Sequence, residues 1–352
     1  MHVLRVTHPK LRLVPEVTTP TSIDPSRLAE GNVDRLGRRI DYMRIAITDR
    51  CNLRCIYCMP EEGVRLQPTH ELLAFEEIWR VAGTAYGLGF RKFRVTGGEP
   101  LVVKNILVFL QGLRRVTGNA TLCLTTNGTL LGPHLDELRD IGIARLNISL
   151  DTLDPARFTQ LTRRSGLNDV LHAIERAAYA GFERVSVNAV IVPGVGDQDL
   201  TPLAALAERL PVDVRFIEQM PLDGHVDGGF LGADAMVARI GKVYPLTQIA
   251  PDDNRQAAQL MYTSPRLRGR IGIIAPRSKK FCISCNRMRL TSTGELKGCL
   301  LSEGTLDIKS ALRSGIDDTE LTTLLRYAIG IKPAEYNDAS YGLDRSMSAI
   351  GG

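Results

Sequence analysis

The chain has 352 residues, 44% of them hydrophobic, a formal net charge of +5 and seven cysteines. It contains no run of about 18 apolar residues, and its first residues carry charge and proline, so we expect neither a membrane span nor a secretory signal. The mild charge permits anionic substrates but does not indicate nucleic acid or membrane binding. Six of the cysteines fall into two triplets, which suits metal ligation in a reducing compartment, and we expect a globular cytoplasmic protein.

Changes in composition and hydrophobic pattern along the sequence predict three parts of the chain. Residues 1–33 are rich in Pro, Thr and Arg without a sustained period, and we expect a poorly ordered arm to which we assign no role. From Tyr42 onward short β-branched or apolar runs alternate with longer helical ones, which is typical of a parallel sheet. This rhythm weakens after about residue 222, so we expect a first domain over residues 34–222 and a C-terminal region over residues 223–352.

The predicted elements of the first domain form six βα units. Strands are expected at Tyr42–Thr48, Arg91–Thr96, Ala120–Thr125, Arg145–Ser149, Val185–Val192 and Val212–Glu218. Helices are expected at Phe75–Gly87, Asn105–Thr117, His134–Asp140, Gly166–Ala180 and Asp199–Arg209. Six units are fewer than the eight of a closed barrel. The predicted fold class is therefore α/β, an open partial (β/α)6 TIM-like barrel whose site lies at the carboxyl edge of the strands.

The first cysteine triplet follows directly after the first predicted strand. Cys51, Cys55 and Cys58 stand at C-x3-C-x2-C spacing, so three thiolates can converge on one small inorganic centre. A cubane iron–sulfur cluster normally takes four thiolates, and with three supplied one iron keeps an open position. A zinc site or buried thiols are the alternatives, but zinc sites usually show paired C-x2-C knuckles, and no second knuckle lies near this triplet. The spacing therefore favours a cluster with an open iron.

Further candidate residues follow the carboxyl ends of other predicted strands. Gly97 and Gly98 let the backbone approach a ligand closely, and the Glu99 carboxylate can receive an ammonium group. Thr125 ends the third strand, and Ser149 ends the fourth. Each segment can equally be an ordinary turn or a helix cap. Their joint position at one edge of the sheet favours a ligand-binding role, at least for Ser149.

The C-terminal region carries the second cysteine triplet. Cys282, Cys285 and Cys299 stand at C-x2-C-x13-C spacing and again leave one iron open. Arg287 and Arg289 stand two residues apart, which in an extended strand places both guanidinium groups on one face, suited to a phosphate or a purine edge. One knuckle of a zinc ribbon is the alternative, but the second knuckle is missing.

These motifs resemble those of a known enzyme family. The first triplet and the Gly-Gly-Glu-Pro segment are similar to the radical S-adenosylmethionine (SAM) superfamily. Both triplets, the strand leading from Arg44 into Cys51, the run from Arg94 to Pro100 and the ending Met347-Ser-Ala-Ile-Gly-Gly resemble the GTP 3′,8-cyclases of molybdenum cofactor biosynthesis. The resemblance covers about residues 34–352. Its most discriminating feature is the terminal Gly-Gly, for which a flexible terminus is the plain alternative.

The resemblance implies a role for each matching residue. One [4Fe-4S] cluster would be bound by Cys51, Cys55 and Cys58, and SAM by Tyr57, Gly98, Ser149 and Met220. A second [4Fe-4S] cluster, whose free iron contacts the guanine base in the family, would be bound by Cys282, Cys285 and Cys299. GTP would be bound by Arg44, Arg94, Thr125, Arg287, Met288 and Arg289. No side chain is expected to act as a catalytic acid or base, and positioning would depend on Arg287, Arg289, Gly351 and Gly352.

The reaction implied is that of a radical SAM lyase at the first step of the pathway. The reduced first cluster cleaves SAM to a 5′-deoxyadenosyl radical, which abstracts the ribose 3′ hydrogen of GTP. The carbon radical then attacks guanine C8, leading to (8S)-3′,8-cyclo-7,8-dihydroguanosine 5′-triphosphate. The implied partners are a reduced flavodoxin- or ferredoxin-type electron donor and cyclic pyranopterin monophosphate synthase, which receives the product. Either a monomer or a homodimer is compatible with the sequence.

One position departs from the family pattern. The family usually carries a GTP-binding lysine on the fifth strand in a Lys-x-Asn arrangement, where this chain reads Ser186-Val-Asn188. Arg184 lies on the same face but about 7 Å back along the strand, so it would substitute only partly. We expect retained activity with weakened GTP binding.

Two alternative functions remain open at this stage. A radical SAM enzyme with one auxiliary cluster could modify a peptide, although such enzymes usually have more auxiliary cysteines and lack a Gly-Gly end. A non-catalytic iron–sulfur redox sensor is the other alternative, and the intact SAM-site motifs speak against it. Detection of 5′-deoxyadenosine after anaerobic reduction with SAM and GTP would separate turnover from a redox role.

Overall fold

The computed structural model describes residues 23–64, 66–220, 229–250, 259–301 and 305–336, and the structural statements below concern these residues. Their strands form one sheet in the order β12-β11-β10-β1-β2-β3-β4-β5-β6-β9-β8-β7. The strands are β1 (Tyr42–Ala46), β2 (Lys92–Thr96), β3 (Thr121–Thr126), β4 (Ile143–Ser149), β5 (Arg184–Ile191), β6 (Asp213–Glu218), β7 (Thr247–Ile249), β8 (Gln259–Thr263), β9 (Arg270–Ile274), β10 (Arg287–Leu290), β11 (Glu295–Lys297) and β12 (Thr305–Asp307).

The sheet is mixed and is not closed by hydrogen bonds. The central strands stand in the order β10, β1, β2, β3, β4, β5, β6 and β9, and each pair of neighbours among these strands is parallel. An antiparallel pair extends each side, β11 and β12 next to β10, and β8 and β7 next to β9. Because β12 and β7 each have one paired neighbour, they are the two edges of the sheet.

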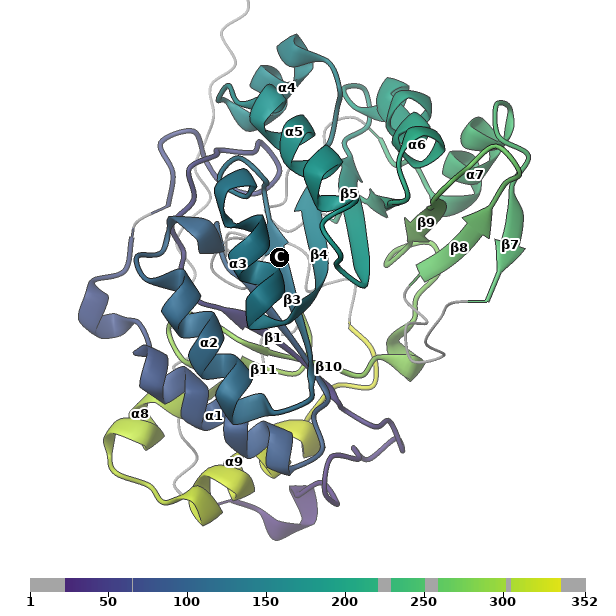
Figure 1. Ribbon diagram of the computed structural model, residues 1–352. Helices are drawn as coiled ribbons and strands as arrows, with labels where there is room; N and C mark the ends of the chain where they lie inside the picture. Colours follow the sequence, from purple (N-terminus) through teal and green to yellow (C-terminus); the bar gives the residue numbers. More distant parts are fainter. Residues whose placement is uncertain (1–22, 65, 221–228, 251–258, 302–304, 337–352) are drawn as a thin grey trace, which may run out of the picture.

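The helices connect the parallel strands, and in Figure 1 α1, α2 and α3 lie side by side over β1 to β4. The α-helices are α1 (Phe75–Gly87), α2 (Ile106–Thr117), α3 (Leu135–Ile141), α4 (Pro155–Thr162), α5 (Leu167–Ala177), α6 (Leu200–Arg209), α7 (Ala233–Gly241), α8 (Ile308–Arg313) and α9 (Asp318–Gly330). Short 3-10 helices are η1 (Pro25–Arg27), η2 (Thr69–Glu71), η3 (Pro100–Val102), η4 (Gly132–His134), η5 (Asp197–Asp199) and η6 (Cys282–Ser284). None of the described helices is long and apolar enough to cross a bilayer.

Alternation along each strand separates a core face from a polar face. In β1, Met43 and Ile45 are fully buried in the main hydrophobic cluster, while Tyr42 and Arg44 face the opposite side and line a cavity. Successive side chains of a strand point to opposite faces, so the same division recurs in the neighbouring strands. The core face also includes Phe93, Val95, Leu122, Leu124, Leu146, Ile148, Val187, Val214, Phe216, Ile271, Ile273, Met288 and Leu290. The polar face is therefore left free to form a site.

The structure confirms the six predicted strands and the five predicted helices of the first domain, with shifts at their ends. It adds α4, for which the sequence offered a signal that we did not use. Asp154 caps this helix by accepting a hydrogen bond from the Arg157 backbone N–H at 2.8 Å, and Pro155 follows at the first helical position. The C-terminal region is also part of the same sheet as the six predicted strands, because β10 pairs with β1 and β9 pairs with β6.

The predicted N-terminal arm is described from residue 23 onward, and residues 1–22 lie outside the described residues. Ala29 is buried and makes two hydrogen bonds with Arg326 of α9. The Ala29 N–H donates to the Arg326 carbonyl at 3.1 Å, and Arg326 Nε donates to the Ala29 carbonyl at 2.8 Å. A side chain at Gly330 would meet the carbonyl of Arg27. Residues 23–33 are thus more ordered than their composition led us to expect.

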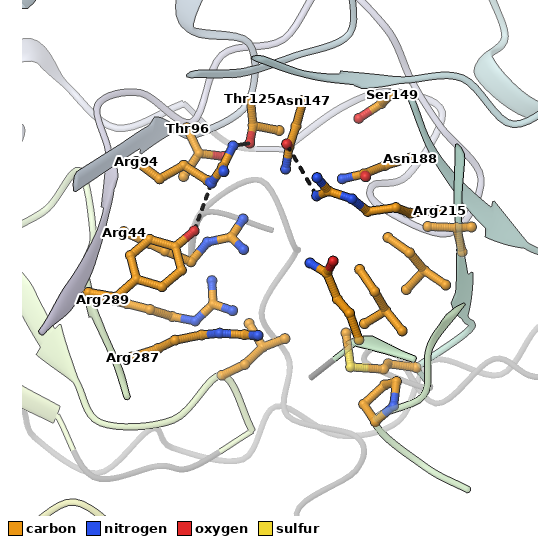
Figure 2. A pocket seen from close by; sticks show the side chains of 18 of the residues that line it. Arg44, Arg94, Thr96, Thr125, Asn147, Ser149, Asn188, Arg215, Arg287 and Arg289 are labelled. Atoms are coloured by element: carbon orange, nitrogen blue, oxygen red, sulfur yellow. Dashed lines mark hydrogen bonds between the residues drawn. The ribbon is translucent and has the colours of Figure 1, made fainter. Parts of the chain in front are cut away.

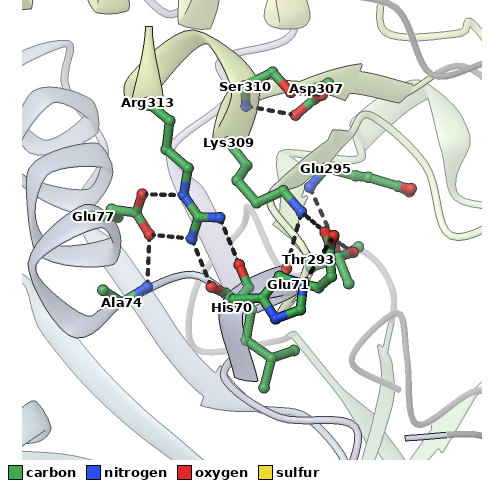
Figure 3. Close-up of polar contacts among 12 residues, drawn as sticks. His70, Glu71, Ala74, Glu77, Thr293, Glu295, Asp307, Lys309, Ser310 and Arg313 are labelled. Atoms are coloured by element: carbon green, nitrogen blue, oxygen red, sulfur yellow. Dashed lines mark hydrogen bonds and ion pairs between the residues drawn. The ribbon is translucent and has the colours of Figure 1, made fainter. Parts of the chain in front are cut away.

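A group of polar contacts joins α8 to the segment before α1 (Figure 3). Arg313 donates to both carboxylate oxygens of Glu77, at 2.9 and 3.1 Å, and to the carbonyl oxygens of His70 and Leu72, at 2.6 and 2.9 Å. Lys309 donates to the carbonyl and to the carboxylate of Glu71. These contacts hold the C-terminal region against the loop that follows the first cysteine triplet.

We predict that Arg313→Ala lowers the free energy of unfolding of the cluster-free protein by about 1–2 kcal/mol at pH 7. This is the range for a charged group with several hydrogen bonds, reduced here because 41% of the Arg313 side chain is exposed. Burial raises the pKa of Glu77, but hydrogen bonds from Arg313 and the Ala74 N–H outweigh it and hold the pKa below its ordinary 4.5.

The sign of the pH dependence follows from that direction. A carboxylate with a depressed folded pKa contributes stability above the unfolded pKa and loses it as the pH falls through the folded value. The difference between the wild-type protein and Arg313→Ala should therefore shrink below about pH 4, as measured by urea unfolding. Arg139→Ala is the matched control, because Arg139 pairs with Asp136 and Asp140 within or next to its own turn of α3. An equal loss in both variants would contradict the prediction.

Candidate functional site

One cavity of about 490 Å³ lies on the polar face of the sheet, and all six triplet cysteines contribute to its lining. The two triplets are far apart in the chain but meet here because β10 pairs with β1. A cavity of this size holds a ligand of cofactor or nucleotide size. The carboxyl ends of parallel strands are the usual place for such a site.

Three arginines form a row across neighbouring strands at one side of the cavity. The register of β10, β1 and β2 places Arg289, Arg44 and Arg94 directly beside one another. Figure 2 shows their side chains together with Arg287, directed into the cavity. Arg94 also donates to Thr125 Oγ1 at 3.2 Å. Like charges in direct cross-strand contact are unfavourable, so this arrangement is suited to a polyanionic ligand.

The pKa values show the strain that these charges place on one another. Burial and the adjacent Arg289 lower the pKa of Arg44 to about 9, and burial and Arg287 lower that of Arg289 to about 10. The Tyr42 hydroxyl accepts a hydrogen bond from Arg94 Nε at 2.7 Å. Burial raises the pKa of Tyr42, but Arg94 and Arg44 outweigh it and bring it to about 7. A bound anion would relieve this repulsion.

Arg215 of β6 faces this row from the other side of the cavity (Figure 2). Its guanidinium donates to Asn147 Oδ1 at 3.4 Å and to the hydroxyl of Ser186, which is fully buried. Burial lowers the pKa of Arg215 to about 10. Arg184, which we expected to substitute partly for the family lysine, instead donates to Asp213 at 3.0 Å. The cation nearest to position 186 is therefore Arg215, a residue that the sequence analysis missed.

The first cysteine triplet lies on an irregular loop after β1. Cys51 Sγ accepts hydrogen bonds from the Leu53 N–H at 3.4 Å and from Asn127 Nδ2 at 3.8 Å. Burial raises the pKa of Cys51 and of Cys55. Binding of iron would offset that burial, because the metal's charge stabilises the thiolate. Three cysteines outside any disulfide, with N–H donors beside one of them, fit the ligand set of an iron–sulfur cluster.

Tyr57, predicted to lie at the SAM site, is fixed by a carboxylate. Its hydroxyl donates to Asp151 Oδ2 at 2.7 Å, while Asp151 Oδ1 accepts from the Val190 N–H at 2.8 Å. Burial raises the pKa of Asp151 to about 6. Ser149 and Met220, also predicted for this site, line the same cavity. The structure thus brings the four predicted SAM residues, Gly98 included, around one space.

The glycines after β2 permit a close approach, but the approach is to the chain's own backbone. The Gly98 N–H donates to the Thr48 carbonyl at 2.8 Å. A Cβ atom at either Gly97 or Gly98 would lie within 3.0 Å of backbone oxygen atoms, those of Thr48 and Arg50 respectively. The segment after β2 is thereby held against the one that leads into Cys51. Gly98 still lines the cavity.

Glu99 does not receive a ligand's ammonium group in the way that the sequence suggested. Its buried carboxylate accepts hydrogen bonds from the Leu101 N–H at 3.0 Å, the Thr126 hydroxyl at 2.8 Å and the Asn127 N–H at 2.6 Å. Burial outweighs these bonds and raises its pKa to about 7. Glu99 therefore joins β2 to β3 and is not among the residues that line the cavity.

The second triplet has a lysine beside it. Lys332 is buried, and its Nζ lies 3.6 Å from Cys285 Sγ and 2.8 Å from the Arg287 carbonyl oxygen. Burial raises the pKa of Cys285, but the charges of Lys332 and Arg287 outweigh it, so the pKa is lowered. Burial raises the pKa of Cys282. A cation that stabilises a thiolate fits metal ligation here too.

Among the described residues, no three His, Cys, Asp or Glu side chains come together as ligands of a single metal ion. The ligands of a four-iron cluster each bind a different iron, so they do not converge on one point. Each triplet supplies three cysteines to the common cavity, with hydrogen-bond donors beside Cys51 and Cys285, and this ligand set is compatible with a cluster.

The predicted GTP residues divide by face. Arg44, Arg94, Thr125, Arg287 and Arg289 line the cavity. Met288 does not, because it lies between the two arginines of β10, and its side chain therefore points into the core, where it is fully buried. Gly351 and Gly352 lie outside the described residues.

Several cavity residues were missed by the sequence analysis. Lys92, Asn147 and Arg215 alternate with apolar residues in their strands, and this alternation could have identified them. Asp151 was considered only as a possible cap. Lys332 had no local signal, since its contact with Cys285 depends on the end of α9 packing near the second triplet.

Comparisons with known proteins agree with this site. The family described as "Radical SAM superfamily" matches residues 45–207, and "Molybdenum Cofactor Synthesis C" matches residues 212–338. The GTP 3′,8-cyclase of Moorella thermoacetica is 42% identical over 91% of this chain and 99% of its own length. This chain belongs to the GTP 3′,8-cyclase family. The predicted family is therefore confirmed.

Other members of the GTP 3′,8-cyclase family show the same extent of similarity. The relative from Rhodopirellula baltica is 40% identical over 95% of this chain and 94% of its own length. The human molybdenum cofactor biosynthesis protein 1 is 38% identical over 86% of this chain and 48% of its own length. Among solved structures, SuiB of Streptococcus suis bound to S-adenosylmethionine has a TM-score of 0.56 at 15% identity, covering 86% of this chain and 77% of that one. That likeness shows the radical SAM α/β fold.

We predict that Gly98→Ala lowers the free energy of unfolding by about 1–3 kcal/mol, the usual cost of forcing an atom into a packed site. The clash is with a backbone carbonyl, that of Arg50, which cannot rotate away as a side chain would. Urea unfolding of the cluster-free protein measures the change. Gly87→Ala is the control, since a Cβ there meets nothing within 4 Å and alanine favours a helix. A Gly98→Ala protein as stable as this control would contradict the prediction.

Proposed function

We propose that this protein is a radical SAM lyase that converts GTP to (8S)-3′,8-cyclo-7,8-dihydroguanosine 5′-triphosphate in the first step of molybdenum cofactor biosynthesis. The observation that carries the proposal is the common cavity of the two cysteine triplets and the arginine row. The family membership agrees with it. The fold would be the open partial (β/α)6 barrel of the sequence analysis, with residues 223–352 as its auxiliary-cluster region.

The arginines would bind the triphosphate. Arg289, Arg44 and Arg94 offer forked donors from three adjacent strands, and Arg287 lies two residues before Arg289 on β10, beside Tyr42. Guanidinium groups match phosphate oxygens in pairs of hydrogen bonds, so a row of them can hold several phosphates at once. Since burial and mutual repulsion already depress the pKa values of Arg44 and Arg289, the triphosphate would stabilise the charged row.

The cysteines would hold two [4Fe-4S] clusters, Cys51, Cys55 and Cys58 the first, and Cys282, Cys285 and Cys299 the second. SAM would be held by Tyr57, Gly98, Ser149 and Met220. The first cluster would supply the one electron that cleaves SAM to methionine and a 5′-deoxyadenosyl radical, and this radical would take the ribose 3′ hydrogen so that the carbon can join guanine C8. The protein's own part is to align these two atoms and to exclude water from the buried cavity. Asp151 would hold the Tyr57 side chain in place during this step.

The other parts of the proposal rest on the family. A reduced flavodoxin- or ferredoxin-type protein would supply electrons, the product would pass to cyclic pyranopterin monophosphate synthase, and the enzyme would act in the cytoplasm as a monomer or homodimer. The Gly351-Gly352 end would reach into the cavity. A peptide-modifying function has only the fold of SuiB in its favour, at 15% identity, whereas the cyclase relatives reach 42%.

Anaerobic reconstitution tests the proposal. We expect about eight irons per chain, and after reduction with SAM and GTP we expect 5′-deoxyadenosine together with the cyclised nucleotide. Mass spectrometry of the products, with ATP and GDP compared, measures the reaction and its substrate. Zinc in place of iron, or 5′-deoxyadenosine without a GTP-derived product, would contradict the proposal. A redox sensor would hold iron but give neither product.

Position 186 supplies a sharper test of the GTP site. We predict that Ser186→Lys lowers the Kd for GTP by about tenfold, because a hydrogen bond from an ammonium group to phosphate contributes about 1.5 kcal/mol. Ser186→Met is the matched control, since it has similar length without the charge and also removes the contact with Arg215. Equilibrium dialysis with labelled GTP measures both. An unchanged Kd in the lysine variant would show that this position does not take part in GTP binding here.

A further inference from the structure

Arg163 combines an unfavourable backbone conformation with contacts to the first cysteine loop. Among the described residues, only Asn105 and Arg163 are non-glycine residues with a positive φ, 61° and 55°. Arg163 is the C-cap of α4, a position where the left-handed conformation favours glycine. The presence of an arginine at a position that favours glycine suggests that the arginine side chain has a function that glycine could not provide.

The end of α4 pairs with the cysteine loop through the backbone. The Arg54 N–H donates to the Thr162 carbonyl at 2.9 Å, and the Ile56 N–H donates to the Leu161 carbonyl at 2.9 Å. The last carbonyls of a helix have no partner within the helix. The loop therefore donates hydrogen bonds to two of these carbonyls. The two donors are the N–H groups of the residues on either side of Cys55, so these bonds also fix the backbone of the loop.

The Arg163 side chain completes this attachment. Its Nη1 donates to the Arg54 carbonyl at 3.0 Å and to the Met59 carbonyl at 3.2 Å. One Nη atom carries two hydrogens, so it can make both bonds at once. Arg54 precedes Cys55, and Met59 follows Cys58. A single nitrogen thus joins the two ends of the segment that carries two of the three cysteines.

The second cysteine loop is held in the same manner by a different arginine. Arg38 Nη1 donates to the carbonyl oxygens of Cys282 and Ala334, at 2.8 and 3.1 Å, and its Nη2 donates to that of Pro333 at 2.8 Å. Arg38 is itself oriented by Asp34, at 2.6 Å. Each triplet therefore has an arginine outside the cavity that bonds the main chain of its loop.

We propose that Arg163 is a positioning residue that keeps residues 54–59 in the conformation in which Cys55 and Cys58 bind the first cluster. It touches neither thiol, so it acts through the backbone of the loop. Without it, the two N–H contacts to α4 and the Tyr57–Asp151 hydrogen bond would remain, and the loop would open more often. The inference rests on the proposed function only in taking this loop to be the cluster-binding one.

Arg163→Gly separates positioning from folding. Glycine adopts the left-handed conformation without strain, which offsets part of the lost hydrogen bonding, so this variant should stay folded and unfold at a urea concentration close to that of the wild-type protein. Its loop should nevertheless open more easily, because both side-chain hydrogen bonds are lost. In the cluster-free protein under reducing conditions, we expect hydrogen exchange in peptides covering residues 51–59 to be at least about tenfold faster. Exchange in peptides covering residues 282–290 should not change.

The loaded protein supplies the second readout. In a background with the second triplet replaced by serine, we expect a chelator to remove iron at least about tenfold faster from Arg163→Gly than from the parent. Arg164→Ala is the matched control, because it removes the neighbouring charge while leaving the bonds to Arg54 and Met59; Arg164 itself donates to the Arg163 carbonyl at 2.7 Å. Arg163→Lys should be intermediate, since a lysine keeps the charge without the forked head.

Two results would overturn the inference. Wild-type exchange rates and iron release in Arg163→Gly would show that the two side-chain bonds do not hold the loop. An equal change in Arg164→Ala would show that local charge, and not the contact, is responsible. If the wild-type protein bound no iron, the proposed function would fail, but the exchange experiment would still decide whether Arg163 holds the loop.

Discussion

The in-register pairing of β10, β1 and β2 is the constraint on which the site depends. It places Arg289, Arg44 and Arg94 side by side and carries the second cysteine triplet to the same cavity as the first. A shift of one residue in β10 would exchange Arg289 with an apolar neighbour, because successive side chains face opposite sides of the sheet. The buried Met288 and Leu290 on the core face oppose such a shift, so core packing also determines where the cations lie.

The two matched families of this chain share one sheet. The strands β9 and β10, both from the C-terminal part, add to opposite sides of the six strands that precede them. Arg313 and Lys309 then bond the segment before α1, and Arg38 of the N-terminal part bonds the carbonyls of Cys282, Pro333 and Ala334. The second cysteine triplet lines the same cavity as the first because the sheet continues through both parts.

The polar face gathers charges whose burial is unfavourable. Arg44 and Arg289 of the row have lowered pKa values, and the buried carboxyls Glu99 and Asp151 have raised ones, to about 7 and about 6. Hydrogen bonds offset part of this cost for the carboxyls, which join β3 to β2 and Tyr57 to β4. Arg44 and Arg289 also lie beside other cations, an arrangement suited to an anionic ligand. This difference distinguishes the residues that shape the cavity from those suited to bind in it.

The sequence by itself determined the six strands and five helices, both cysteine triplets, the pairing of Arg287 and Arg289 on one face, and the family. The elements and the motifs depend on local periodicity and spacing, which a single sequence displays, and the family was given by the resemblance of the motifs. Only the tertiary structure decided that Arg215 contacts Ser186, that Glu99 faces the neighbouring strand, that Met288 lies in the core, and that Arg163 and Lys332 reach the cysteine loops. Such contacts join segments distant in the chain, and their geometry follows from sheet register and helix packing, which no local pattern specifies.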